Sequence, residues 1–202
     1  MRQWFLMLAT LTTLSACGVH IKMPVYRATL SDSPPDQFAY VLNEITVKGT
    51  LYEQDVVILD GDVKTTMKPP AAEWLREAVI TEFGMAGLVA SQDQQARLPK
   101  VDIVVEQFFA EQVNNFFLLL VLSDQAAITM IRITVTSPDG SVAYDRRFVG
   151  HLEDINQFRY IYPVFFMAAS YDLGDMLHKT AQQALSEAAS ETRRLFEQGS
   201  IR

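Results

Sequence analysis

The chain is poor in cysteine, in histidine and in basic residues. Its 202 residues include one cysteine and three histidines, and 17 Lys and Arg stand against 24 Asp and Glu. The formal charge of −7 and the pI of about 4.9 argue against nucleic acid as a partner, because such a partner calls for a basic patch. They also argue against electrostatic adhesion to anionic lipid. A single cysteine forms no disulfide within its own chain.

Motifs of common active sites are missing as well. The sequence has neither a G-x-S-x-G nucleophile elbow nor a glycine-rich phosphate loop. His20, His151 and His178 do not stand at the spacing of metal ligands, so we expect no metal and no cofactor. Asp60-Gly61-Asp62 lacks the later oxygen ligands of a calcium loop and predicts a turn.

Paired carboxylates are the remaining hint of catalysis. Glu153-Asp154 and Asp145 could supply such a pair. Acidic residues beside Arg146 and Arg147, however, are typical of a solvated strand edge. We therefore expect a protein that is not an enzyme.

The N-terminus carries the most specific signal. Arg2 precedes an apolar run from Trp4 to Leu14, which is the pattern of a signal peptide and is shorter than the about 20 residues of a spanning helix. Leu14-Ser15-Ala16-Cys17 resembles a bacterial lipobox. That resemblance implies that the Cys17 thiol receives diacylglycerol, that residues 1–16 are removed and that the new amino group is acylated. The alternative is an ordinary signal peptide or a buried N-terminal helix with an incidental cysteine.

The resemblance also implies a location. One acyl chain anchors a protein poorly, whereas three anchor it almost permanently. Gly18 and Val19 stand where some lipoproteins of the inner membrane carry Asp. We therefore expect a lipid anchor on the periplasmic face of the outer membrane, with the inner membrane as the alternative. Removing residues 1–16 leaves 186 residues, enough for one domain with a substantial core.

Residues 17–37 are expected to form the lipidated N-terminus and a tether. Pro24 and the run Ser31-Asp32-Ser33-Pro34-Pro35-Asp36 stiffen and extend such a segment. One interpretation is a spacer that lifts the domain off the lipid surface. The other is an irregular arm that packs along the domain.

Residues 38–198 predict a periplasmic α+β domain, with a mainly antiparallel sheet and two helices packed on one of its faces. The expected strands are 38–47, 56–65 with a turn at Asp60-Gly61, 101–109, 116–122, 128–136 and 142–150, and the turn Ser137-Pro138-Asp139-Gly140 joins the last two. Asn114-Asn115 is expected to interrupt the chain before the run 116–122. The expected helices are 71–90, with a possible end near Phe83, and 170–198. Trp74, Leu75, Ala78, Val79, Glu82, Phe83 and Ala86 recur at helical spacing on the first helix, and all but Glu82 are apolar. On the second helix Leu173, Leu177, Ala181, Ala184, Leu185, Ala188, Leu195 and Phe196 form the expected buried stripe.

Three segments together resemble a known family. Leu75-Arg76-Glu77-Ala78-Val79, Val101-Asp102-Ile103-Val104-Val105 and the turn at 137–140 are similar to YajG-type bacterial lipoproteins. The same plan occurs in auxiliary lipoproteins of ABC-type transporters that handle membrane lipids. The resemblance covers residues 38–198 and implies a small periplasmic sheet-and-helix domain. It supplies no catalytic residues to carry over.

Two apolar insertions, near 114–123 and 156–170, depart from that plan. In one interpretation both are buried, because a short apolar run fits a strand covered on both faces. In the other they lie together at one end of the sheet as an exposed patch, which usually marks a partner or membrane interface. The residues that would make this contact are Phe116, Phe117, Leu118, Tyr160, Tyr162, Phe165, Phe166 and Met167.

Two functions remain as hypotheses from the sequence. The first is a membrane-anchored periplasmic lipoprotein that acts as a non-enzymatic interaction or envelope-assembly module. The second is an auxiliary lipid-binding component of an ABC-type envelope transport system. In either case the partners are the membrane, through the anchor, and an envelope protein or a lipid.

Overall fold

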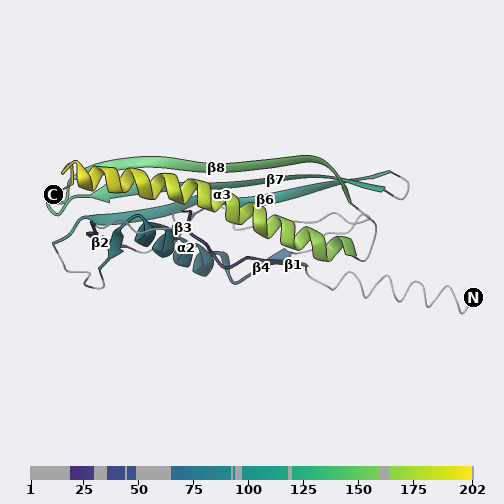
Figure 1. The fold of residues 1–202 in the computed structure, drawn as a ribbon, viewed down its shortest axis with the longest axis horizontal. Coiled ribbons are helices and arrows are strands. Elements are labelled where there is room, and N and C mark those ends of the chain that lie inside the picture. Colours follow the sequence, from purple (N-terminus) through teal and green to yellow (C-terminus); the bar gives the residue numbers. More distant parts are fainter. Residues whose placement is uncertain are drawn as a thin grey trace, which may run out of the picture.

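The computed structural model describes residues 19–29, 36–43, 45–48, 65–91, 93, 97–117, 120–159 and 164–201. Within these ranges the surroundings of the side chains are described for all but residues 19–22, 65–66, 111–124 and 155–172. The elements in chain order are β1 (Val19–Lys22), β2 (Phe38–Leu42), β3 (Thr46–Val47), β4 (Thr65–Lys68), α2 (Ala71–Met85), β5 (Leu88–Ala90), β6 (Lys100–Phe117), β7 (Leu120–Thr136), β8 (Val142–Arg159) and α3 (Val164–Glu197). The predicted α+β class is confirmed (Figure 1).

Three long strands, β6, β7 and β8, form the body of the main sheet and pair antiparallel in that order. On β7 every second side chain from Gln125 to Val135 is buried. This is the period of a strand that turns one face to the core and the other toward solvent. The predicted alternation of Ile131, Ile133 and Val135 with more polar residues is therefore confirmed.

The turn between β7 and β8 is built from the residues that the sequence indicates. The Asp139 carboxylate accepts the backbone N–H of Ser141 at 2.9 Å, and the N–H of Gly140 donates to the carbonyl of Ser137 at 2.9 Å. Gly140 has a φ of +87°, which favours glycine because side chains with a Cβ crowd the backbone there. This turn is confirmed.

A bulge on β6 changes which residues face the core. Buried side chains fall on odd positions up to Val105 and on even positions from Phe108 to Ala110. The pairing with β7 shifts between Val105 and Gln107, so Glu106 is the extra residue. A bulge of this kind preserves one buried face although the sequence alternation changes phase.

The described part of the main sheet is mixed. Its strands run in the order β5-β2-β6-β7-β8, and β3 pairs with β6 beyond the end of β2. The pairs β2–β5, β2–β6 and β3–β6 are parallel. β1 and β4 form a separate parallel pair.

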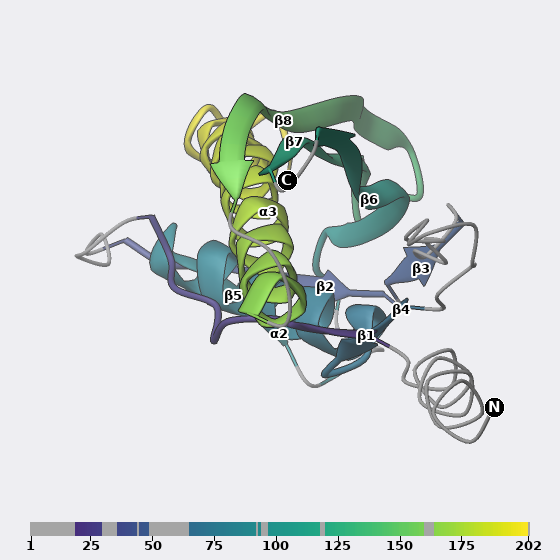
Figure 2. The same cartoon turned by 90° about the vertical axis from the view of Figure 1, so that its right-hand side faces the viewer.

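Both helices cover the same face of the sheet. α2 follows Pro69-Pro70, as expected for a residue type that suits a first helical turn, and it is followed by Gly87 with a φ of +80°. α3 contacts β6, β7, β8 and β1, and α2 contacts α3 and β5. Figure 2 shows α2 and α3 against each other, with the three long strands curling over α3.

The predicted helix faces are confirmed. Every predicted residue of α2 and its C-terminal flank is buried, including Glu82. On α3 the predicted stripe from Leu173 to Leu195 is buried, and Phe196 packs partly buried against it. In the part of the chain that the structure describes, no helix combines the length and apolar character needed to cross a membrane.

Several predicted bounds are wrong. β6 runs through Asn114-Asn115 without interruption, because these residues continue the pairing with β7. The run 116–122 is therefore not one strand: Phe116 and Phe117 end β6, and Leu120 begins β7. β8 extends to Arg159, well beyond the predicted end at Gly150.

The helix bounds and the first strands differ too. α3 begins at Val164 rather than at 170, and α2 ends at Met85, where β5, which the sequence did not predict, soon follows. Residues 38–47 form two strands instead of one. The turn at Asp60-Gly61 lies outside the described residues, and β4 pairs in parallel with β1.

Candidate functional site: the clamped arm and the end next to Cys17

The segment Met23–Thr29 packs between the helices, and we call it the arm. Met23 and Tyr26 are buried in the core. The indole N–H of Trp74 on α2 donates to the carbonyl of Pro24 at 2.7 Å. For residues 23–29 the spacer interpretation is therefore wrong, and the irregular arm is what the structure shows.

A buried carboxylate on α2 holds the arm in place. Glu82 is 1% exposed and accepts the Tyr26 hydroxyl at 2.8 Å and the backbone N–H of Thr29 at 3.2 Å. Burial and the neighbouring carboxylate raise the pKa of Tyr26, so its hydroxyl stays a donor. A buried carboxyl group is tolerated only where such donors reach it, which makes Glu82 a fixed attachment point.

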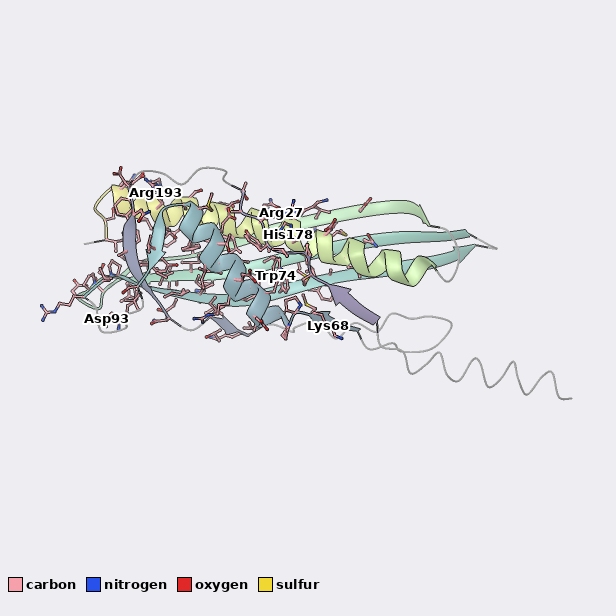
Figure 3. All side chains as sticks on the ribbon, turned by 60° about the horizontal axis from the view of Figure 1, so that its bottom comes forward. Arg27, Lys68, Trp74, Asp93, His178 and Arg193 are labelled. Carbon is pink, nitrogen blue, oxygen red and sulfur yellow. The ribbon has the colours of Figure 1, made fainter. Side chains whose placement is uncertain are left out.

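His178 on α3 contacts the arm from the side opposite α2. The Arg27 backbone N–H donates to Nε2 of His178 at 3.3 Å, and the Gln182 side chain donates to the Arg27 carbonyl. The imidazole lies edge-on to Tyr26 and Trp74, with ring centroids 5.3 and 5.9 Å away. Burial lowers the pKa of His178, which favours the neutral form that accepts this hydrogen bond. Figure 3 shows Arg27, His178 and Trp74 in this region.

The arm fixes the direction in which the chain approaches its N-terminus. Asp36 lies near the end of α3, because its carbonyl accepts the Arg193 side chain at 3.1 Å. Arg27 lies beside His178, which precedes Arg193 by about four turns of α3. Going back along the chain therefore means moving toward the start of α3. β1, which contacts α3, continues this path, and Val19 follows Cys17 by two positions.

The apolar residues singled out from the sequence belong to two segments whose described parts, in the β6–β7 hairpin and the first turn of α3, lie toward that same end. Phe116 and Phe117 close the β6–β7 hairpin opposite Val121 and Leu120. Val121 also pairs with Arg159, the last residue of β8. Phe165, Phe166 and Met167 lie in the first turn of α3, which begins five positions after Arg159. Figure 1 shows the hairpin, the start of α3 and β1 toward one end, and Figure 2 looks onto it.

Leu118, Tyr160 and Tyr162 lie outside the described residues, and Cys17 does too. Of the remaining five only the backbone is described. The described backbone places the β6–β7 hairpin and the first turn of α3 toward the same end of the molecule, and the patch with its contacts stays a prediction.

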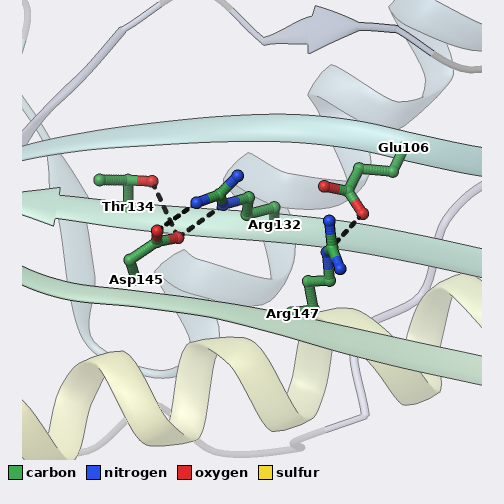
Figure 4. Close-up of polar contacts among 5 residues, drawn as sticks. All are labelled: Glu106, Arg132, Thr134, Asp145 and Arg147. Atoms are coloured by element: carbon green, nitrogen blue, oxygen red, sulfur yellow. Dashed lines mark hydrogen bonds and ion pairs between the residues drawn. The ribbon is translucent and has the colours of Figure 1, made fainter.

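Two ion pairs between residues of different strands lie on the outer face of the sheet (Figure 4). Arg132 binds Asp145 through two hydrogen bonds across β7 and β8, and Arg147 pairs with the bulge residue Glu106 at 2.8 Å. The guanidinium of Arg132 lowers the pKa of Asp145. Asp145 therefore stays ionised and paired, the arrangement of a solvated strand rather than of a general acid.

The other suspected groups are dispersed. His151 is exposed on β8 and lies 3.3 Å from Glu153, whereas His178 is held by the arm on α3. Among the described residues, no group of histidine, cysteine, aspartate and glutamate side chains could hold a metal ion.

Sequence reasoning missed the clamp itself. Tyr26 and Thr29 lie more than 50 positions from Glu82. The one available signal was Glu82 in an otherwise apolar helical stripe, because a carboxylate on a buried face requires donors from elsewhere.

Comparison with known proteins gives a fold and no family. No family model matches this chain, and no curated protein does. Among solved structures, protein XCC0632 of Xanthomonas campestris, described with the family model DUF330, is 14% identical with a TM-score of 0.56 over 90% of this chain and 98% of that one. This likeness supports the fold alone.

Two further structures overlap less well. A neuraminyllactose-binding hemagglutinin homologue of Helicobacter pylori is 11% identical, with a TM-score of 0.37 over 89% of this chain and 94% of that one. A hypothetical protein of Chlamydia trachomatis is 8% identical, with a TM-score of 0.37 over 81% and 96%.

Proposed function

We propose that this protein is a lipid-anchored lipoprotein on the periplasmic face of the outer membrane, and that its domain is a non-enzymatic interaction module. The observation that carries the proposal is the clamped arm. β1 begins two positions after Cys17 and is already paired with β4, and the arm that follows is held by Glu82, Trp74 and His178. A lipid on Cys17 would therefore hold the domain directly at the membrane surface.

The contacts of the titratable groups support a structural role for them. Glu82 and His178 attach the arm, and Asp145 is paired with Arg132. Each of these groups is held in a partnered state that suits packing or a solvated sheet. A catalytic acid or base instead requires a pKa near the working pH and an accessible position.

The test is to label cells with an alkyne analogue of palmitate and to compare the wild type with Cys17→Ser. We expect the lipid label and a modified N-terminal peptide by mass spectrometry in the wild type alone, with the protein in the outer-membrane fraction. Crosslinking in intact cells should recover an envelope protein with the anchored form only. Unlabelled wild-type protein would contradict the anchor.

A second function is supported by the position of the β6–β7 hairpin and the first turn of α3, which lie toward the same end of the molecule. Such a place suits an auxiliary lipid-binding component of an ABC-type envelope transport system. Native mass spectrometry of the purified protein tests it. Phospholipid bound in a fixed ratio favours this function over the first.

A further inference from the structure

The strand β8 forms one edge of the described sheet. In the strand order β5-β2-β6-β7-β8 it pairs with β7 on one side, and no other described strand pairs with it. From Tyr144 to Asp154 the pairing with β7 runs without a shift, so this part of the strand is regular. A regular edge presents a row of backbone donors and acceptors to which a further strand can bind.

The backbone groups that point away from β7 belong to the odd-numbered residues of this part of β8. The His151 N–H donates to the side chain of Gln183 on α3 at 3.3 Å, so it points away from β7. In an antiparallel pair this direction alternates from residue to residue, so the backbone groups of Arg147, Val149 and Glu153 point the same way. The Gln183 side chain is exposed, and an incoming strand can displace it.

The same four residues place their side chains on the outer face of the sheet. Val149 is 40% exposed, and the side chains of Arg147, His151 and Glu153 are 63%, 50% and 55% exposed. Along β8 they therefore present a cation, two residues without a fixed charge and an anion. Opposite charges on directly facing residues of two strands stabilise their pairing, and like charges weaken it. A strand that binds here has to match a guanidinium at one end and a carboxylate at the other.

We propose that the outward edge of residues 146–154, the β8 edge, binds an extended segment of a partner protein as an additional antiparallel strand. The segment carries an acidic residue opposite Arg147, a basic residue opposite Glu153 and uncharged side chains opposite Val149 and His151. Backbone hydrogen bonds supply the affinity, and these four side chains supply the specificity. The proposal rests on the proposed function, because it gives the interaction module a binding surface.

The proposed anchor favours a partner protein over a second copy of this chain. In sequence β8 matches its own edge, because an antiparallel copy centred on Gly150 brings Arg147 opposite Glu153 and Val149 opposite His151. Such a pair points the two molecules in opposite directions, whereas two copies held upright by their lipids in one membrane point the same way. Pairing of two β8 strands is therefore closed to copies that stand side by side on one membrane.

The experiment uses a peptide with the sequence of residues 144–154 as its probe, because this peptide carries the required charges in the required order. It is labelled with a fluorophore and kept at tracer concentration, so that it does not pair with itself. Fluorescence anisotropy measures its binding to the full-length lipidated protein in detergent micelles and to the Cys17→Ser protein. The β8 edge does not need the lipid, so a failure of the anchor is distinguished from a failure of this proposal.

Proline substitutions test whether the backbone of the edge is used. Val149→Pro removes an N–H that points away from β7 and leaves the hydrogen bonds between β7 and β8 intact, as proline on an edge strand allows. Val142→Pro, at the first residue of β8, is the matched control. We expect the peptide to bind the wild type and Val142→Pro equally, and Val149→Pro at least about tenfold more weakly. Urea midpoints verify that both variants are folded.

A charge exchange tests direction and register without proline. Glu153→Arg in the protein places a cation opposite the Arg147 position of the peptide and should weaken binding about tenfold. A peptide carrying Arg147→Glu should bind this variant as the original peptide binds the wild type. A parallel strand, or one in another register, would show no such rescue.

Unchanged binding to Val149→Pro, or the absence of rescue by the exchanged peptide, would overturn the proposal. Dimers of the lipidated protein in sedimentation velocity that Val149→Pro abolishes would also overturn it, because the edge would then belong to a second copy. In intact cells, an envelope protein crosslinked equally to the wild type and to Val149→Pro would overturn the β8 edge and leave the proposed function intact. Failure to crosslink any envelope protein to the wild type would contradict the proposed function itself.

Discussion

At the scale of single residues, polar groups inside the core differ in whether they have a hydrogen-bond partner. Glu82 is buried and satisfied, because Tyr26 and the Thr29 backbone donate to it. The Tyr40 hydroxyl on β2 is buried too, but it has no hydrogen-bond partner in the described structure. A buried group that keeps its partner contributes to stability, whereas an unsatisfied one costs its desolvation.

These two tyrosines form a matched pair for mutation. Tyr26→Phe removes a donor to a buried carboxylate and should lower the free energy of unfolding by about 1.5–3 kcal/mol, the range for hydrogen bonds to charged groups. Tyr40→Phe removes a hydroxyl that gains nothing from burial and should be neutral or stabilising. Urea denaturation measures both. Equal losses in the two variants would contradict the role of Glu82 as an attachment point.

His178 makes stability depend on pH. Its folded pKa lies below the ordinary value of 6.5, chiefly because of burial, so the unfolded chain binds the proton more readily. The stabilisation is complete above about pH 6.5 and is lost as the pH falls from there through the folded pKa. We expect His178→Gln, which keeps an acceptor for Arg27, to reduce the loss of stability between pH 7.5 and 5. An identical pH profile in both proteins, measured by urea midpoints, would refute this.

At the scale of elements, α3 approaches the sheet closely where β8 has no side chain. A Cβ on Gly150 would lie 1.9 Å from the carbonyl oxygen of Thr180, closer than any real contact. Beside it the buried Thr180 hydroxyl donates to the carbonyl of Leu177 at 3.0 Å and accepts the Thr129 hydroxyl at 2.8 Å. At this point α3 therefore packs directly against the backbone of β8.

Two glycine substitutions test this close approach. Gly150→Ala should force α3 away from the sheet and cost at least about 1–3 kcal/mol, the usual range for overpacking. Gly84→Ala on α2 meets nothing within 4 Å and should stabilise by about 0.5–1 kcal/mol, because alanine is the better helix former. Thermal unfolding of the two variants compares them directly. A harmless Gly150→Ala would disprove the tight contact.

At the scale of the whole molecule, the two ends differ in composition. The end with the β6–β7 hairpin, the start of α3 and β1 contains the described parts of the two apolar insertions, and the C-terminal end of α3 carries ion pairs such as Arg193 with Glu197 and Arg194 with Glu191. β7 alone, with 17 residues, spans about 50 Å at about 3.3 Å per residue. The β6–β7 hairpin is thus far from the C-terminal end of α3.

The proposed lipid on Cys17, two positions before β1, predicts that the long axis of the protein stands upright on the membrane. A donor dye at Asp139→Cys on the lipidated protein should lie about 50 Å from an acceptor dye in the vesicle surface, the length of β7. Energy transfer should be strong from Phe117→Cys and weak from Asp139→Cys. Equally efficient transfer from both positions would mean that the molecule lies flat.

Features that depend on near neighbours in the chain followed from the sequence. The buried faces of α2 and α3, the alternation on β7 and the turn at 137–140 all result from the geometry of one element and its own residues. The ends of the elements were predicted less well from the sequence. Asn114-Asn115, for example, indicates a break until the pairing of β6 with β7 is known. A strand partner, not local propensity, extends β6 and β8.

Features that depend on distant pairs were decided by the tertiary structure alone. No local pattern relates Tyr26 to Glu82 or Arg27 to His178, because those contacts bring together residues 56 and 151 positions apart. The same holds for the placement of the β6–β7 hairpin and the start of α3 toward one end of the molecule. The lipobox resemblance, which predicts an anchor, is a property of adjacent residues. Where that anchor would lie relative to the sheet follows only from the arm, since its path is set by side chains that distant helices contribute.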